Sequence, residues 1–411
     1  MRFRTAWRAT PRRSLDWLNF WVAALQAGFG AFIPAYLASA GWRAADIGLA
    51  LSLGTIATMA GQLPAGALID AVHAKRLAAA IALVLVGVSA LLLAMNSGRG
   101  FVYGAELLHG AASCAIPPAI AAITLAIFGH AEFGERVGHN TRFAAIGTGV
   151  AAGFLGGFGG TVSERAIFLA TATMCLPALL AVYALGPRHH CPEEHRDHPA
   201  MMHPRQRREL KLRAWHVLHE RGLYPFAAAA GLFTLGNAAM LPFALTRGVS
   251  ALVVSATVIV PQAVAALLSP WLGRTAQRIG RRRILLLGLI ALPIRGIAFA
   301  LLPGAVPLLL AQTLDGVSSA MFGIMLPLIS CDISRRSGAF NLTMGGIGLV
   351  ISVGATLSTT LAGLMTETLG IRTTLLGLAG AGGLATLLAW LAMPETKPVE
   401  RLTVGQSLRA H

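Results

Sequence analysis

The chain is divided by short polar segments into apolar runs, each about as long as a lipid bilayer is thick. A hydrocarbon core of about 30 Å needs roughly 20 apolar residues in a helix. Such runs lie at 17–39, 47–69, 78–95, 102–128, 143–161 and 166–186, and then at 223–246, 251–272, 284–302, 306–331, 343–365 and 372–393. Only 12% of the residues are charged, about half the usual share in soluble proteins. The sequence therefore predicts an all-α polytopic membrane protein with twelve transmembrane helices.

Basic residues gather on alternate sides of these helices. With the N-terminus in the cytoplasm, 27 of the 33 Lys and Arg residues fall in cytoplasmic segments, five fall on the opposite side, and Arg295 lies inside a helix. This is the positive-inside bias of membrane proteins. The formal charge of +16 is thus explained by topology, and the expected partner is the lipid bilayer, with no nucleic acid. We predict a multi-pass protein of the cytoplasmic (inner) membrane whose termini are both cytoplasmic.

The two halves of the chain repeat each other at an offset of about 201–208 residues. Gly28 and Pro34 match Gly236 and Pro242, His109 matches Asp315, and Asn140 matches Asn341. Six helices in each half give both copies the same orientation, an arrangement with a solute site between the halves near the bilayer midplane. The predicted segments are a cytoplasmic N-terminal segment (1–16), a six-helix bundle (17–186), a cytoplasmic His-rich linker (187–222), a second six-helix bundle (223–393) and a cytoplasmic tail (394–411).

A basic motif follows the second helix of each half. The copies read Gly66-Ala-Leu-Ile-Asp70-Ala-Val-His73-Ala-Lys75-Arg76 and Gly273-Arg274-Thr-Ala-Gln277-Arg278-Ile-Gly280-Arg281-Arg282-Arg283. Both resemble the loop Gly-x-x-x-Asp-Arg-x-Gly-Arg-Arg of the major facilitator superfamily. Ala71 replaces the family's Arg in the first copy, and Gln277 replaces its Asp in the second. The resemblance covers nearly the whole chain and implies two pseudo-symmetric six-helix bundles, the major facilitator fold.

In that family the loop gates the contact between the halves on the cytoplasmic side. The resemblance carries this role onto Gly66, Asp70, Lys75, Arg76, Gly273, Arg278, Gly280 and Arg281. The alternative for Asp70 is a solvated loop carboxylate. A second motif of the family, the Gly-Pro-x-x-Gly-Gly run of many antiporters, resembles Ala152-Gly153-Phe154-Leu155-Gly156-Gly157 without its Pro. It favours export, and plain packing of small residues is the alternative.

Charged side chains inside the predicted spans indicate function, because they are costly in hydrocarbon. At 1.5 Å per residue, Arg295 lies roughly 17 Å from the cytoplasmic side, and Asp315 lies roughly 14 Å from the opposite side. Neighbouring antiparallel helices can pair the two at these depths. A buried ion pair can serve structure alone, so a structural pair and a functional site both stay open.

Glu106 and His109 are three residues apart and share a face of the fourth span. The resemblance implies that helices 1, 4, 7 and 10 line the central cavity. Glu106, His109 and Asp315 are candidates for proton coupling, since a carboxylate in low dielectric holds a proton near neutral pH and histidine titrates there. A simply packed histidine is the alternative for His109. Further polar candidates on these helices are Gln26, Asn237 and Gln312, with Thr234, Ser318 and Ser319 beside them.

Seven of the twelve histidines lie in the predicted linker. Imidazole and thiolate groups bind copper, zinc or nickel. Candidate metal ligands are His189, His190, Cys191, His195, His198 and His203, although they form no fixed ligand motif.

Together these features predict a secondary active transporter of a small solute, working by alternating access, coupled to protons and exporting an organic compound. The sequence contains no GxxxxGK[ST] nucleotide-binding loop, so it gives no sign of transport driven by nucleotide hydrolysis. We expect a monomer that is not an enzyme, needs no cofactor, and has the solute and protons as partners. Two alternatives stay open: a transporter of a transition metal or of a siderophore-like metal chelate, and a non-transporting membrane sensor or assembly factor on the same fold.

Overall fold

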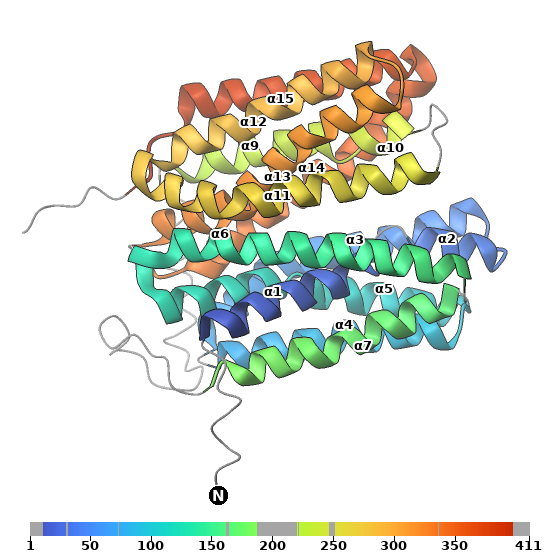
Figure 1. Ribbon diagram of the computed structural model, residues 1–411, viewed down its shortest axis with the longest axis horizontal. Helices are drawn as coiled ribbons and strands as arrows, with labels where there is room; N and C mark the ends of the chain where they lie inside the picture. The colour runs from blue at the N-terminus through green and yellow to red at the C-terminus, as the bar shows by residue number, and fades with distance from the viewer. Residues whose placement is uncertain are drawn as a thin grey trace, which may run out of the picture.

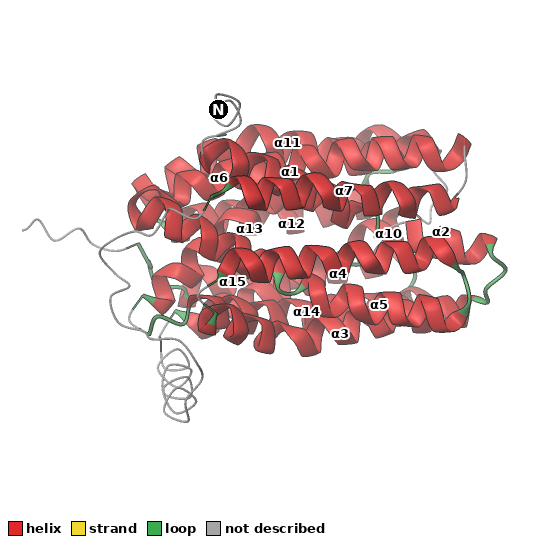
Figure 2. Cartoon of the chain, turned by 90° about the horizontal axis from the view of Figure 1, so that it is seen from below, coloured by secondary structure: helices red, strands yellow, loops and turns green. Residues whose placement is uncertain are grey.

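The computed structural model describes residues 11–29, 32–72, 74–161, 164–186, 220, 222–245, 251–335 and 337–397. His73, nearly all of the predicted linker and the end of the tail lie outside the described residues. Within these ranges the chain is helical, and helices run side by side between two ends where the turns gather (Figure 2).

The helices fall into two groups along the chain. The first comprises α1 (Pro11–Ala27), α2 (Phe32–Ser39), α3 (Ala44–Ala71), α4 (Lys75–Met95), α5 (Arg99–Ser113), α6 (Ile116–Thr161) and α7 (Glu164–Ala184). The second comprises α9 (Leu223–Asn237), α10 (Met240–Leu245), α11 (Ala251–Ile279), α12 (Arg281–Leu301), α13 (Ala305–Ser334), α14 (Phe340–Leu369) and α15 (Ile371–Ala392). The first group forms the lower bundle of Figure 1 and the second group the upper one. The bundles meet mainly where α3 packs on α14 and where α6 packs on α11.

Eleven helical segments of the described chain are long and apolar enough to cross a membrane. One of them, Arg99–Leu155, has 57 residues, more than twice the roughly 20 that one crossing needs. Its backbone leaves helical geometry at Gly129, with φ 64° and ψ 179°, where a positive φ suits glycine. This segment therefore crosses twice, which gives the twelve predicted spans, and the all-helical membrane fold is confirmed.

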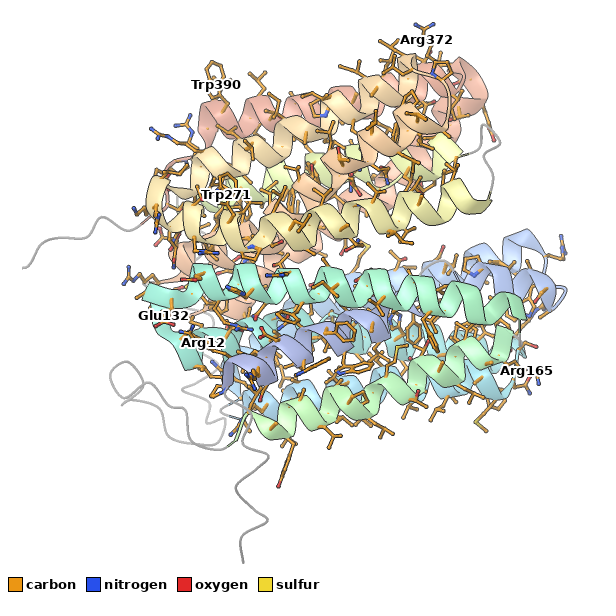
Figure 3. All side chains as sticks on the ribbon, viewed as in Figure 1. Arg12, Glu132, Arg165, Trp271, Arg372 and Trp390 are labelled. Atoms are coloured by element: carbon orange, nitrogen blue, oxygen red, sulfur yellow. The ribbon has the colours of Figure 1, made fainter. Side chains whose placement is uncertain are left out.

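Large apolar side chains cover the outside of both bundles. Leu180 is 64% exposed, Leu267 76% and Trp390 57%, and Trp390 projects from the outer face of the upper bundle in Figure 3. A surface this apolar would associate in water. It is suited to hydrocarbon, as expected of a membrane-spanning chain.

Charged residues mark the two ends of the molecule. Figure 3 places Arg12 and Glu132 at one end, and Arg165 and Arg372 at the other. We call the first the Asp70 end, because α3 finishes there and α14 begins, and the second the Arg165 end. The positive-inside bias predicts that the Asp70 end faces the cytoplasm.

The internal repeat is visible in the contacts between the bundles. A β-carbon added to Gly66 would lie 2.3 Å from the carbonyl oxygen of Asn341, and one added to Gly273 would lie 2.4 Å from that of Gly134. Residue 273 is 207 positions after 66, and 341 is 207 after 134. The pair Gly138–Ser269 and the pair Gly345–Gln62 are related by the same offset. Both halves therefore use glycine to bring the same two helices backbone to backbone.

The fifth span differs from its prediction in two respects. The repeat contact matches Asn341 with Gly134 rather than with Asn140, so the register of the fifth span shifts by six residues. That span also begins just after Gly129 instead of at residue 143. The charged residues between 130 and 142 make the apolar run begin later than the helix does. In the folded chain these charges have partners, because Arg136 pairs with Asp16 and Glu132 with Arg12.

The first helix of each bundle is interrupted at matching positions. α1 ends at Ala27 and α2 begins at Phe32, whereas α9 ends at Asn237 and α10 begins at Met240. Gly28 lies in the first break, and Gly236 lies beside the second. Added β-carbons there would lie 2.1 Å from Thr171 Oγ1 and 2.7 Å from the Leu378 carbonyl oxygen. The second break places Asn237 beside the charged residues of the C-terminal bundle.

Candidate solute site and gate

A buried arginine joins three helices of the C-terminal bundle. Arg295 on α12 is 2% exposed; its Nη1 donates to Asp315 Oδ1 on α13, and its Nη2 donates to Asn237 Oδ1 on α9 at 2.6 Å. Its Nε lies 3.4 Å from Met240 Sδ, and its Cζ lies 5.7 Å from the centre of the Phe299 ring. The structure thus contains the Arg295–Asp315 pair that the two depths predict, and it adds Asn237 as a third member.

A cavity of about 330 Å³ lies against this cluster. The described residues that line it come from α9, α13 and α14: Phe233, Thr234, Asn237, Asp315, Ser318, Ser319, Phe322 and Ile351. The Asp315 side chain is 24% exposed and is part of the cavity lining. The seventh and tenth membrane spans of the predicted site, which are α9 and α13, therefore line the cavity together with the eleventh span, α14. A contribution from the first and fourth spans stays a prediction.

The histidine of the fourth span lies in the N-terminal bundle. His109 Nε2 is 2.9 Å from Gln26 Oε1; because an amide oxygen only accepts, Nε2 is the donor. The ring stacks on Phe29 with centroids 3.9 Å apart and planes at 4°. His109 and Gln26 are therefore brought together, away from Arg295 and Asp315.

Glu106 lies on the same helix as His109 but faces α3. It is 4% exposed, and among the described residues its carboxyl group has no hydrogen-bond or ion-pair partner. A β-carbon on Gly54 would lie 2.4 Å from Glu106 Oε2. The glycine of α3 thus leaves the space that this carboxyl group occupies.

Gln312 is not part of the cavity. It is fully buried and donates from Nε2 to the Thr257 carbonyl oxygen on α11 at 2.7 Å. Its contact joins two helices within the C-terminal bundle.

Asp70 connects the two bundles at the Asp70 end. Its Oδ1 accepts from the backbone N–H and the side-chain Nδ2 of Asn341, at 3.1 and 2.6 Å, and its Oδ2 accepts from the backbone N–H of Leu342 at 2.8 Å. These amides belong to the first turn of α14, where free N–H groups and the helix dipole favour an anion. Lys75 at the start of α4 is close enough to attract Asp70 electrostatically, and Arg76 follows it. The carboxylate is therefore a bridge between bundles and not a solvated loop group.

The second copy of the motif is tied mostly to its own bundle. Arg281 Nε donates to Asp332 Oδ2 at 3.0 Å, and its backbone N–H donates to Glu395 Oε1 at 2.8 Å. Gly280 has φ 108°, and the Arg278 carbonyl oxygen accepts from Lys397 Nζ at 2.8 Å. Gln277, which replaces the family's Asp, still reaches the other bundle, because its Nε2 donates to the Ala131 carbonyl oxygen at 2.8 Å.

One polar network at the Asp70 end was not predicted. Arg136 is 6% exposed; it pairs with Asp16 on α1 and donates to Asn140 Oδ1 at 2.9 Å. Asn140 Nδ2 donates to Thr124 Oγ1 at 2.9 Å. The sequence placed Arg136 in a loop, and nothing in its spacing links it to an acid 120 positions away.

The candidate metal ligands of the linker lie outside the described residues. Within the described ranges, no group of three or more His, Cys, Asp or Glu side chains is placed to hold a metal ion. Metal binding by His189, His190, Cys191, His195, His198 and His203 stays a prediction.

Comparison with known proteins identifies the family. The family model described as Major Facilitator Superfamily matches residues 17–292 and 222–409. The chain belongs to the major facilitator superfamily. Two uncharacterized MFS-type transporters of Mycobacterium tuberculosis, from the CDC and H37Rv strains, are each 32% identical to it over 394 residues, which cover 93% of both chains.

Solved structures of this superfamily share the fold. FucP, a transporter solved in the outward conformation, gives a TM-score of 0.72 at 16% identity, over 94% of this chain and 99% of that one. The human organic anion transporter MFSD10 (TETRAN) gives a TM-score of 0.69 at 12% identity, over 93% and 100%. The chain is accordingly a multi-pass membrane protein with the fold and family of a secondary transporter.

Labelling of a buried cysteine at the bundle interface can test whether the Asp70 bridge holds this end of the molecule closed. The Cys331 thiol is 3% exposed and lies 3.3 Å from His130 Nδ1, across the bundle interface near this end. In a chain that keeps Cys331 and has Cys114, Cys175 and Cys191 replaced by Ala, we expect Asp70→Ala to raise the rate of maleimide labelling at least about tenfold. Asp70 accepts three hydrogen bonds, and loss of even one charge-assisted bond, which contributes about 1.5–3 kcal/mol, increases the open population by about tenfold or more.

Asp46→Asn is the matched control, since Asp46 pairs with the exposed Arg99 at the opposite end of α3. Equal labelling of the parent and Asp70→Ala chains would show that the carboxylate does not hold this end closed.

Proposed function

We propose that the chain transports a small organic solute by alternating access and couples this movement to protons. It acts as a monomer in the cytoplasmic membrane, with both termini in the cytoplasm, and catalyses no reaction. The observation that carries this proposal is the cavity of about 330 Å³ bordered by Asp315. Its volume is at the lower end of ligand pockets, which run from about 300 to 1,000 Å³, and this supports a small solute.

Alternating access is supported by the chemistry of the bundle interface. At the Asp70 end the bundles are held by glycine contacts with backbone carbonyls and by the hydrogen bonds of Asp70 and Gln277. Such contacts can break and re-form without unfolding a helix. They suit rigid bundles that rock about a central site.

Proton coupling is assigned to Glu106. An isolated ionised carboxylate away from water is very unfavourable, so a buried group without a partner is neutral. Asp315 differs, because Arg295 stabilises its charge, and His109 is held by Gln26 and Phe29. Of the three predicted candidates, Glu106 is therefore the one that carries a proton in this conformation.

Export is the proposed direction, supported by the antiporter-like segment that includes Gly153. Transport of a metal or metal chelate is the second candidate and has its support in the linker histidines. The buried Glu106 and Arg295 disfavour a sensor without transport activity. Ionisable side chains are energetically costly within the membrane, and a protein that no longer transports a solute would not need them.

Reconstitution tests the proposal. In proteoliposomes with an imposed pH gradient, screened against organic solutes, metals and metal chelates, we expect gradient-driven flux of an organic solute. Glu106→Gln, a neutral side chain of the same size, should reduce this flux at least about a hundredfold, because it cannot release a proton. Exchange of labelled for unlabelled solute without a gradient should persist.

Asp46→Asn again serves as the control, since this carboxylate is in an exposed ion pair. Gradient-driven flux that survives in Glu106→Gln would exclude Glu106 as the proton carrier. Absence of flux for every solute in the parent protein would favour the sensor.

A further inference from the structure

We infer that the cavity beside Asp315 binds a small organic amine in its cationic form and disfavours anions. This rests on the proposal that the cavity is the solute site. The inference follows from which atoms of the Arg295–Asp315 pair reach the cavity.

The positive member of the pair is withdrawn from the cavity. Arg295 is 2% exposed and is absent from the cavity lining, whereas Asp315 and Asn237 both line it. Its three nitrogen atoms are directed at Asp315, Asn237 and Met240. An anionic solute could reach this guanidinium only by displacing groups that already satisfy it.

The negative member faces the solute. Asp315 uses Oδ1 for Arg295, and among the described residues no partner is found for Oδ2. A carboxylate has about four acceptor positions, so Asp315 can accept from a solute while it remains paired. The cavity therefore meets the negative end of a neutral ion pair, which favours an N–H donor with positive charge.

The hydroxyl groups of the lining add further acceptors. Thr234 Oγ1 donates to the Ala230 carbonyl oxygen at 2.8 Å, Ser318 Oγ to that of Gly288 at 2.8 Å, and Ser319 Oγ to that of Gly316 at 3.2 Å. Each hydroxyl donates its hydrogen to a backbone carbonyl oxygen, and its own oxygen lone pairs remain available to accept from a solute. Among the described lining residues, the Asn237 amide nitrogen is the side-chain donor left to oppose this excess of acceptors.

Aromatic rings complete the match to an amine with an apolar body. The rings of Phe233 and Phe322 lie 4.4 Å apart at 33°, and both border the cavity together with Ile351. Ring faces attract cations and bury apolar groups. The cavity thus combines acceptors at one wall with apolar surface at another.

Direct binding to the purified full-length protein tests this without requiring transport. The probes are phenethylamine, hydrocinnamate and hydrocinnamyl alcohol, which share a phenyl group and differ in the terminal group. By calorimetry we expect phenethylamine to bind at least about tenfold more tightly than either of the others, because only the ammonium makes charge-assisted hydrogen bonds with acceptors.

Two variants make the test specific. In Asp315→Asn the Arg295 charge is no longer balanced, so the order should reverse and hydrocinnamate should bind best. Asp315→Glu keeps the charge and should keep the preference for the amine, and it provides a result if Asp315→Asn does not fold. Asp46→Asn, far from the cavity at the Arg165 end, should bind as the parent does.

Parent protein that binds hydrocinnamate as well as or better than phenethylamine, or that binds no amine at millimolar concentration, would overturn the inference. So would an unchanged order in Asp315→Asn. Proton-driven flux of another solute in proteoliposomes would in that case leave the proposed function intact, so the two failures are distinguishable.

Discussion

Arg295→Ala is expected to abolish transport and to lower the free energy of unfolding by about 3–5 kcal/mol, the usual cost of removing one member of a buried ion pair. The guanidinium connects α12 to α13 through Asp315 and to α9 through Asn237. Its removal leaves the charge of Asp315 without its partner and empties space beside Met240 and Phe299. Both the wall of the cavity and the packing of three helices should change.

Flux in proteoliposomes and thermal unfolding in detergent separate these two effects. The double variant Arg295→Met, Asp315→Asn removes both charges while keeping the volume, so stability should return and transport should not. Arg99→Ala is the matched control, because Arg99 is 67% exposed in its pair with Asp46 and exposed pairs contribute about 0–1 kcal/mol. Full transport by Arg295→Ala would show that the Arg295–Asp315 pair is not required for the transport mechanism.

Gly66→Ala is expected to reduce transport at least about a hundredfold, because it adds one carbon where the bundles touch and protein interiors do not absorb such overlap. The new carbon would lie 2.3 Å from the carbonyl oxygen of Asn341 and 2.9 Å from its carbonyl carbon. Both obstructing atoms are backbone, so α14 itself must move away. The Asp70 end then cannot close, and the cycle stops with that end open.

A chain without the other cysteines should show this state as faster maleimide labelling of Cys331. Gly273→Ala should have the same effect, because its added carbon would lie 2.4 Å from the Gly134 carbonyl oxygen. Gly48→Ala is the control on the same helix as Gly66, since its added carbon meets nothing within 4 Å. Normal transport by Gly66→Ala would show that the closed contact is not part of the cycle.

The sequence was sufficient for features that depend on length and depth. Apolar runs predicted the twelve spans, and matching depths in neighbouring helices predicted that Arg295 meets Asp315. The repeat was also recognisable, because glycine and proline recur where the backbone must break or come close. These features follow from the bilayer and from the chain itself.

Features that depend on partners could not be predicted. Glu106 and His109 share a helical face, yet one faces Gly54 on α3 and the other faces Gln26 on α1. Gln312 is on the helix of Asp315 but bonds to α11. The start of the fifth span was missed because charge in a sequence signals a loop, and only packing shows that Asp16 neutralises Arg136.

The two interfaces between the bundles share their glycines but differ in electrostatics. Along α3 and α14, the part-buried Asp70 carboxylate holds a helix N-terminus. Along α11 and α6, the neutral Gln277 holds a carbonyl oxygen, and the only charged contact of this motif with α6 among the described residues is the pair of Arg274 with Glu135 at 3.9 Å, whose side chains are about half exposed. Dissolved ions screen an exposed ion pair far more than a part-buried contact. Ionic strength therefore acts unequally on the two interfaces, and the Arg274–Glu135 pair is the contact that added salt should weaken first.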